Sequence, residues 1–275
     1  MPHLDEPTWR SRADAHAARA DALTAGHRAR RARHESHPVE DFLFTYYPTR
    51  PNRLRVWHPG AGVTLENAAE RGAWKHYTPD GTRVDPTTIR PATIAFVRGL
   101  LAATAARPAQ LGCFGLHEWA MVYRADETRH PVPLRLGAAG TDTVVENHRI
   151  RCTHYDAYRF FTADAAPRNA GTPTRERQVE LEQPGCLHAT MDLYKWATKL
   201  GPAVPGELLL DTFELARDVR TLDMRASPYD LAAHGYTPVR IETAAGKAEY
   251  AEAQRGFADR GAELRGRLLD VLAHC

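Results

Sequence analysis

The stretch "CLHATMDLYKWATKL", residues 186–200, decides the fold class of this chain because it predicts a helix of several turns. A second helix is predicted from Pro205 to about Arg225, and residues 244–275 predict one or two more. This last segment carries an apolar stripe at helical spacing, formed by Phe257, Leu264, Leu268 and Leu272. Together these segments indicate a mainly helical fold.

The earlier part of the chain contains three further predicted helices. Residues 7–33 are rich in Ala and Arg, and we interpret residues 1–35 as a helical N-terminal arm on the surface. Residues 85–108 predict a helix with Asp85 at its N-cap. Residues 115–124 suit a buried helix better than a strand.

The segment "TDTVVENHRIRCTHYDAYRFF", residues 141–161, has the alternation typical of a β-strand. Alternate residues of a strand share a face, so His154 and Asp156 are expected to point the same way. The predicted face consists of Glu146, His148, Ile150, Cys152, His154 and Asp156. We therefore expect an α+β, mainly helical fold, with residues 1–275 forming a single domain that has a short central strand region.

Composition excludes several classes of protein. The chain has 275 residues, of which 43% are hydrophobic, so it can bury a sizeable core. It contains no apolar run long enough for a membrane span and begins without the apolar core of a signal peptide, so we expect a cytoplasmic protein. A net charge of +2 gives no reason to expect a nucleic-acid partner. The four cysteines form no CxxC pair of the kind that binds zinc.

Three of the fourteen histidines lie inside apolar or aromatic segments, and each has a carboxylate nearby. Glu118 follows His117 directly, and Asp156 lies two residues after His154. His188 and Asp192 are four residues apart, so they share one face of the predicted helix. Interior imidazoles need partners, and each one alone suits a hydrogen-bonded core residue. Three such pairs together favour a functional site.

Metal binding is the chemistry that this set fits best. Two histidines and one carboxylate with open positions are typical of non-haem iron oxygenases, and similar ligands hold catalytic zinc. We predict His117, His154 and His188 as ligands, with Asp156 as the preferred carboxylate. Asp192 and Glu118 are the alternative ligands or the partners that orient the histidines. We also expect substrate contacts from Tyr46, Tyr47 and Arg159.

Other motifs give weaker indications. The chain lacks the GxSxG, GxGxxG and GxxxxGK[ST] patterns of hydrolases and nucleotide-binding proteins. "HPGAGVTLENAA", residues 58–69, has the P-G-x-G-V order of the phosphate-binding hairpin in helix-hairpin-helix DNA glycosylases. His58 replaces the usual apolar residue before the proline, and the usual lysine is missing after the turn. A structural glycine turn is the simpler interpretation.

Several long motifs resemble an actinobacterial family whose members are commonly labelled 3-methyladenine DNA glycosylase. They include "GCFGLHEWAMVYR" (112–124), "RCTHYDAYRFF" (151–161), "QPGCLHATMDLYK" (183–195) and "DMRASPYDLAAHGYTPVRIET" (223–243). The resemblance extends from about residue 9 to the C-terminus. The family includes a non-haem iron enzyme of oxazinomycin biosynthesis. That enzyme uses O2 to rearrange the pyridine ring of a C-nucleoside to a 1,3-oxazine, with release of cyanide.

The resemblance implies an Fe(2+)-dependent oxygenase that acts on a nucleoside-like small molecule in C-nucleoside antibiotic biosynthesis. Three alternatives stay open at this point: a DNA glycosylase, a metal-dependent hydrolase, and a non-catalytic protein whose histidines pair in the core. A glycosylase would bind DNA with steep salt dependence, and a hydrolase would work with zinc without oxygen. The sequence does not choose between iron and zinc or decide whether the chain forms a homodimer.

Overall fold

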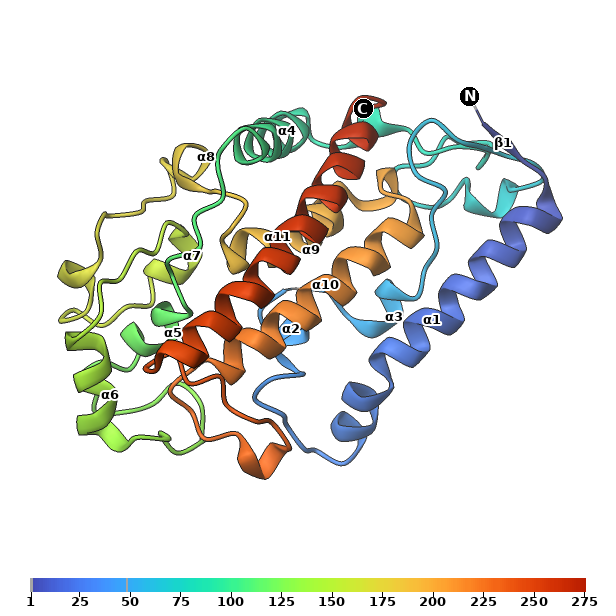
Figure 1. Ribbon diagram of the computed structural model, residues 1–275. Helices are drawn as coiled ribbons and strands as arrows, with labels where there is room; N and C mark the ends of the chain where they lie inside the picture. The colour runs from blue at the N-terminus through green and yellow to red at the C-terminus, as the bar shows by residue number, and fades with distance from the viewer. Residues whose placement is uncertain (1, 48) are drawn as a thin grey trace.

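Three long helices form the centre of the fold in the computed structural model, which describes residues 2–47 and 49–275. They are α9 (Leu187–Leu200), α10 (Gly206–Arg225) and α11 (Ala244–Leu272). Helix α10 packs against both α9 and α11, as Figure 1 shows, and their facing side chains are buried. The prediction of a mainly helical α+β fold is confirmed.

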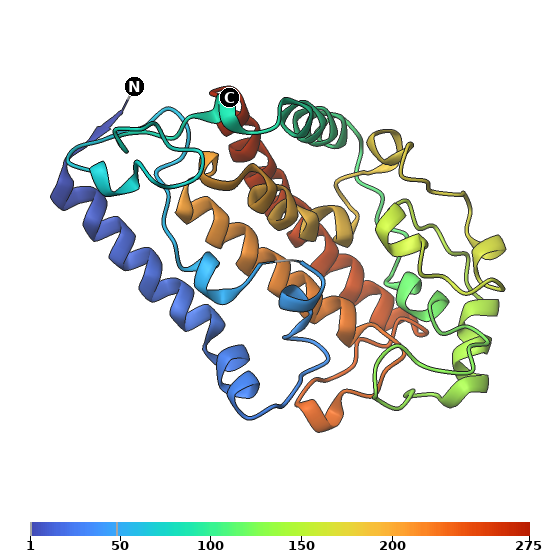
Figure 2. The same cartoon turned by 180° about the vertical axis from the view of Figure 1, so that it is seen from behind.

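Helix α1 (Glu6–Ala32) runs along one flank of this centre, beside α10 (Figures 1 and 2). It begins where the Asp5 side chain accepts a hydrogen bond from the backbone of Thr8. Trp9, His16 and Ala20 point inward and are buried. The helix predicted over residues 7–33 is therefore confirmed, and one of its faces packs on the body of the protein.

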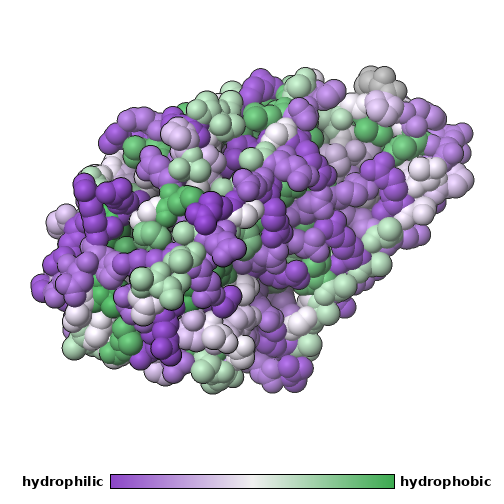
Figure 3. Space-filling view, in the orientation of Figure 1, coloured by the Kyte–Doolittle hydropathy of each residue, from purple (hydrophilic) through white to green (hydrophobic). Residues whose placement is uncertain are grey.

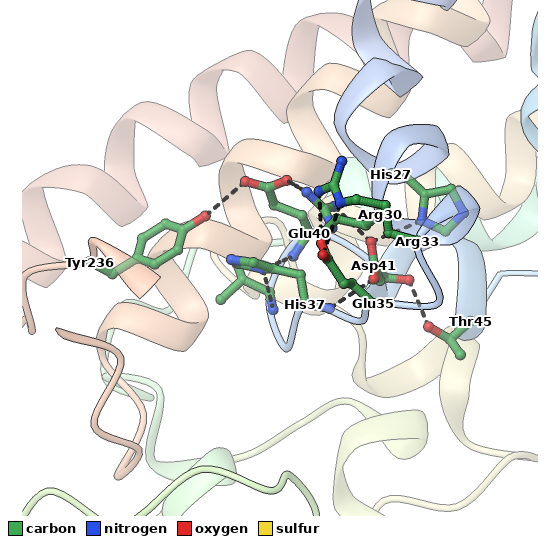
Figure 4. Close-up of polar contacts among 10 residues, drawn as sticks. His27, Arg30, Arg33, Glu35, His37, Glu40, Asp41, Thr45 and Tyr236 are labelled. Atoms are coloured by element: carbon green, nitrogen blue, oxygen red, sulfur yellow. Dashed lines mark hydrogen bonds and ion pairs between the residues drawn. The ribbon is translucent and has the colours of Figure 1, made fainter. Parts of the chain in front are cut away.

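Asp41 fixes the chain after α1 and so positions the segment that reaches the centre of the fold (Figure 4). Its carboxylate accepts hydrogen bonds from His27 Nδ1 at 2.9 Å and Arg30 Nη2 at 2.7 Å. It also accepts one from the backbone amide of His37 at 2.8 Å. Helix α2 (Phe42–Thr45) begins at the next residue. These contacts therefore tie α2 and the tyrosines that follow it to the end of α1.

The helix predicted over residues 85–108 is shorter in the structure. Asp85 caps a 3-10 helix, Pro86–Thr88, by accepting from the backbone of Thr87, and α4 (Pro91–Ala105) begins separately after Arg90. The prediction of Asp85 as the cap of the long helix was wrong. A proline disfavours helical backbone at the residue before it, so Arg90 is not helical and a new helix begins at Pro91. The remaining short helices are α3 (Pro51–Leu54), α5 (Leu116–Ala120), α8 (Gln178–Leu181), and the 3-10 helices Ala69–Arg71, Ala166–Arg168, Gly201–Ala203 and Ala232–His234.

The strand predicted over residues 141–161 was wrong. Its first part belongs to α6 (Gly137–Glu146) and its last part to α7 (Tyr155–Tyr158). The residues between are extended and form one isolated parallel bridge, between Ile150 and Asn169. Beyond it, the side chain of Asn169 bonds the backbone N–H and C=O of Cys152 where a neighbouring strand would. Alternation therefore marked an extended segment and not a sheet. His154 precedes α7 and Asp156 lies in its first turn, so they share no strand face.

The strands of the described chain lie elsewhere. β1 (His3–Leu4) and β2 (Thr64–Leu65) form a parallel pair near the N-terminus. No helix among the described residues is long and apolar enough to cross a membrane. Hydrophilic residues cover most of the face drawn in Figure 3, and hydrophobic ones are scattered over it in small patches.

Candidate metal centre

The structure brings His117, His154 and His188 together, although three separate segments carry them. His117 lies on α5, His188 lies in the first turn of α9, and His154 lies in the extended segment before α7. The rings of His117 and His188 meet edge to face, with centroids 4.5 Å apart. The rings of His188 and His154 stack at 5.3 Å. His188 is therefore the middle member of a row of three imidazoles.

Two of these histidines share a carboxylate that comes from α10. Ligand atoms of His117, His188 and Asp223 lie within 4.8 Å of one another. His117 Nε2 is 2.8 Å from Asp223 Oδ1, and Arg220 Nη1 donates to Asp223 Oδ2 at 3.2 Å. We call these three residues the open group, because His188 also lines a cavity.

This inner cavity has an empty volume of about 440 Å³, which includes space open to solvent. Aromatic and charged side chains surround it. Its lining consists of Phe42, Tyr46, Glu118, Met121, Arg129, His130, Asp156, Phe160, His188 and Arg220. A wider outer cleft, lined in part by Arg159, Arg175 and Lys199, shares Tyr46, Asp156 and Phe160 with it. The two spaces therefore adjoin.

The third histidine belongs to a second, fully buried set. Ligand atoms of His154, Glu182 and Asp192 also lie within 4.8 Å of one another, and each residue is at most 2% exposed. His154 Nε2 is 3.4 Å from Glu182 Oε1 and 3.4 Å from Asp192 Oδ2. We call these three residues the closed group. The closed group contacts the open group where the ring of His154 stacks on the ring of His188.

Further side chains hold the carboxylates of the closed group. Tyr47 donates its hydroxyl to Asp192 Oδ1 at 2.9 Å, and Lys195 Nζ donates to Asp192 Oδ2 at 2.9 Å. Gln178 Nε2 donates to Glu182 Oε1 at 2.6 Å. These contacts orient both carboxylates toward the imidazole of His154.

Burial and neighbouring charges set different protonation states along the row of imidazoles. Burial and the adjacent His117 lower the pKa of His188 well below its ordinary value, so its ring is neutral at pH 7. Burial acts on His117 in the same direction, but the charge of Asp223 outweighs it and raises the pKa of His117. Likewise Asp192 and Glu182 raise the pKa of His154 against the effect of burial. Neutral His188 is thus ready to bind a metal ion.

The predicted carboxylates Asp156 and Glu118 lie near the histidines but belong to neither group. Asp156 Oδ2 accepts from Lys195 at 2.7 Å, and its Oδ1 is 3.2 Å from Arg159 Nε. Glu118 Oε1 accepts from Arg220 Nη1 at 2.8 Å. Both line the inner cavity, where these ion pairs hold them. Asp192, the other predicted carboxylate, lies in the closed group.

The three predicted substrate contacts occupy different positions. Tyr46 lines both the inner cavity and the outer cleft. Arg159 lines the outer cleft, where it pairs with Asp156. Tyr47 is 2% exposed, and its hydroxyl is engaged by Asp192.

Sequence reasoning missed Asp223 and Glu182. Asp223 lies 106 residues after His117, so no spacing rule connects them. Glu182 directly follows the short helix α8, which comes after a polar loop, in a context typical of a surface residue. Only the packing of α10 and α8 beside the histidines identifies these carboxylates.

The glycine turn of residues 58–63 has a structural role. Gly60 has φ +88° and lies against Pro205, and Ala61 donates its amide to Ala203 O at 2.9 Å. Strand β2 follows the turn where the glycosylase hairpin has a helix. Comparisons with protein-family models, with curated proteins and with solved structures gave no match to this chain.

Proposed function

We propose that this protein is a mononuclear non-haem Fe(2+)-dependent oxygenase that holds its iron through the open group, His117, His188 and Asp223. In this proposal it uses O2 to rearrange a heteroaromatic ring, converting a pyridine C-nucleoside to a 1,3-oxazine with release of cyanide. One observation carries the proposal: two imidazoles and one carboxylate converge beside a cavity lined by aromatic and charged side chains.

The donor set of the open group fits a divalent iron ion. Two imidazoles with a single carboxylate leave coordination positions for other ligands, and this combination is typical of iron oxygenases. Arg220 donates to the second oxygen of Asp223, which orients the carboxylate toward His117. Bound iron would supply the electrons that allow O2 to react with an organic ring. Asp223 replaces Asp156 as the proposed carboxylate ligand.

The cavity supports the choice of a flat heteroaromatic substrate. Phe42, Tyr46 and Phe160 line it with aromatic rings, and Phe42 stacks on Tyr46 with ring centroids 5.0 Å apart. Arg220 lies over the ring of Phe42 at 4.0 Å and bonds Glu118, so this wall is fixed before a substrate enters. The substrate would thus lie beside His188 with little reorganisation of the wall.

The outer cleft supports entry from solvent. Its empty volume is about 1200 Å³, and it adjoins the inner cavity at Tyr46, Asp156 and Phe160. Lys195 and Arg159 are held there by Asp156, so donors stand ready for the hydroxyl groups of a sugar. We propose a small nucleoside-like molecule and O2 as the reaction partners.

Oxygen uptake after anaerobic reconstitution with Fe(2+) tests this function. We expect uptake that depends on both the iron and a pyridine C-nucleoside, with cyanide formed in proportion. The protein loaded with Zn²⁺ serves as the control and should consume no oxygen. Turnover of the nucleoside by the zinc form without oxygen would replace the oxygenase with a metal-dependent hydrolase.

A further inference from the structure

We propose that the closed group, His154, Glu182 and Asp192, is a second site for a divalent transition-metal ion such as Zn²⁺, Mn²⁺ or Fe²⁺. This site is separate from the iron site of the proposed function and does not depend on it. The donors are one imidazole and two carboxylates, a set that such ions accept.

The spacing of the donor atoms is the first support. His154 Nε2 lies 3.4 Å from an oxygen of each carboxylate, beyond the usual range of a hydrogen bond. Two ligand atoms bound at about 2.1 Å to one tetrahedral ion lie about 3.4 Å apart. His154 and each carboxylate are therefore spaced as two ligands of one ion, and ligand atoms of all three residues lie within 4.8 Å of one another.

The hydrogen-bond state of His154 is the second support. Its side chain is 1% exposed, and neither ring nitrogen has a hydrogen-bond partner of good geometry among the described residues. A single N–H at Nε2 can donate well to only one of the two facing carboxylates. Buried polar groups are normally satisfied, so an imidazole aimed between two carboxylates needs an explanation. A metal ion at that point satisfies all three side chains at once.

The charge around the group also favours a cation. Glu182 and Asp192 bring two carboxylates into a buried region, and Lys195 is shared between Asp192 and Asp156. Lys195 compensates part of this charge, and a divalent ion would balance the rest. A carboxylate oxygen has two lone pairs, so Asp192 Oδ2 can accept from Lys195 and still bind an ion.

The hydrogen bonds to the two carboxylates are of the kind that orient the ligands in known metal sites. Tyr47 fixes Asp192 and Gln178 fixes Glu182, each through a hydrogen bond to a carboxylate oxygen. Such contacts orient the ligands before the ion binds. They also explain why Tyr47, although near the outer cleft, directs its hydroxyl inward.

The position of the group assigns the ion a structural role. Within the described chain, none of its three side chains lines the inner cavity or the outer cleft. The ring of His154 stacks on His188 with an angle of 27° between the planes. An ion on His154 would therefore fix the ring beside His188 without meeting substrate.

Metal content of single-site variants tests the proposal. The apoprotein is loaded with Zn²⁺, desalted and analysed for zinc per folded chain. We expect two ions in the wild type and one ion each in His154→Gln and Asp223→Asn. The matched control is His16→Gln, which alters another buried histidine, one whose Nε2 bonds Leu54 O. This control should retain both ions.

Each alternative result has a distinct meaning. One ion in the wild type that persists in His154→Gln and disappears in Asp223→Asn would overturn the second site and leave the proposed function intact. One ion that disappears only in His154→Gln would support the closed group and overturn the metal site of the proposed function. Zinc contents equal in the wild type and in both variants would overturn both sites.

A second variant keeps the test independent of folding defects. Lys195→Met removes a positive charge beside the closed group without changing a ligand. We expect Zn²⁺ affinity of the closed group, measured in the Asp223→Asn background, to rise at least about tenfold. Unchanged or weaker affinity would show that no cation binds next to Lys195.

Discussion

The open group and the closed group lie side by side, joined by the stacked rings of His188 and His154. Among the described residues, the open group lines the inner cavity and the closed group does not. Both consist of imidazole and carboxylate donors from helices and loops of the same centre. In the open group, the middle imidazole is half-buried and neutral, whereas every member of the closed group is at most 2% exposed. If the open group holds the proposed iron and the closed group the proposed second ion, access to a cavity, more than donor type, separates the two roles.

Loss of the Asp223 carboxylate should give the largest effect. Asp223→Asn removes the only carboxylate that the proposed iron site has, so we expect oxygen uptake to fall more than about 100-fold. The matched control is Asp218→Asn on the same helix, since Asp218 is 37% exposed and pairs with Arg260 at the surface. Full activity in Asp223→Asn would show that the reaction does not take place at the open group.

Arg220 should be the most costly basic residue to remove. It is 2% exposed and donates to both Glu118 and Asp223, so Arg220→Met leaves Glu118 without this ion pair and Asp223 with His117 alone. We expect the free energy of unfolding to fall by about 3–5 kcal/mol in urea titrations. Arg217→Met, on the same helix with a side chain 43% exposed, should change it by less than about 0.5 kcal/mol. Equal effects would mean that the buried ion pairs do not stabilise the wall of the cavity.

Metal binding should become weaker at acid pH in both groups. Neighbouring carboxylates overcome burial and raise the pKa values of His117 and His154, so both rings hold protons in the metal-free protein below those raised values. An ion must displace these protons, so affinity falls as pH falls, by about tenfold per pH unit for each proton. We expect about one proton released per ion, measured by calorimetry in buffers of different ionisation enthalpy. Affinity independent of pH would contradict these protonation states.

The smallest effects should come from the two adjacent tyrosines, and they should differ. Tyr47→Phe removes the donor to Asp192, which we expect to cost about 1 kcal/mol of stability and to weaken only the closed group. Tyr46→Phe alters a cavity wall, so KM for the nucleoside should rise while zinc content stays unchanged. The reverse assignment of these two effects would contradict the arrangement of the two groups.

The sequence predicted helices well because their signals are local. Residues 186–200 and the segment from Pro205 to Arg225 carry their own apolar periodicity, and α9 and α10 follow them within a residue or two. The prediction of a strand over residues 141–161 was wrong because alternating apolar and polar residues also suit an extended segment outside a sheet. Here the backbone of that segment bonds the side chain of Asn169. Local pattern alone does not say whether a partner strand exists.

The candidate site was predictable in part for a similar reason. His117, His154 and His188 could be selected because each is polar inside an apolar segment, which signals an interior position. Their division into two groups follows from the placement of Asp223 and Glu182, which come from α10 and from the end of α8. Such contacts depend on how helices pack, and no spacing within a single segment encodes them.

Binding of nitric oxide to the Fe(2+)-loaded protein tests the central claim most directly, because nitric oxide binds only iron with an open position. The account predicts an EPR signal of the ferrous nitrosyl in the wild type and in His154→Gln, altered when the nucleoside is added. In Asp223→Asn it predicts no signal that responds to the nucleoside, because any iron left there is held by the closed group. A nucleoside-responsive signal that persists in Asp223→Asn and disappears in His154→Gln would contradict the account, since the reactive metal would then belong to the closed group.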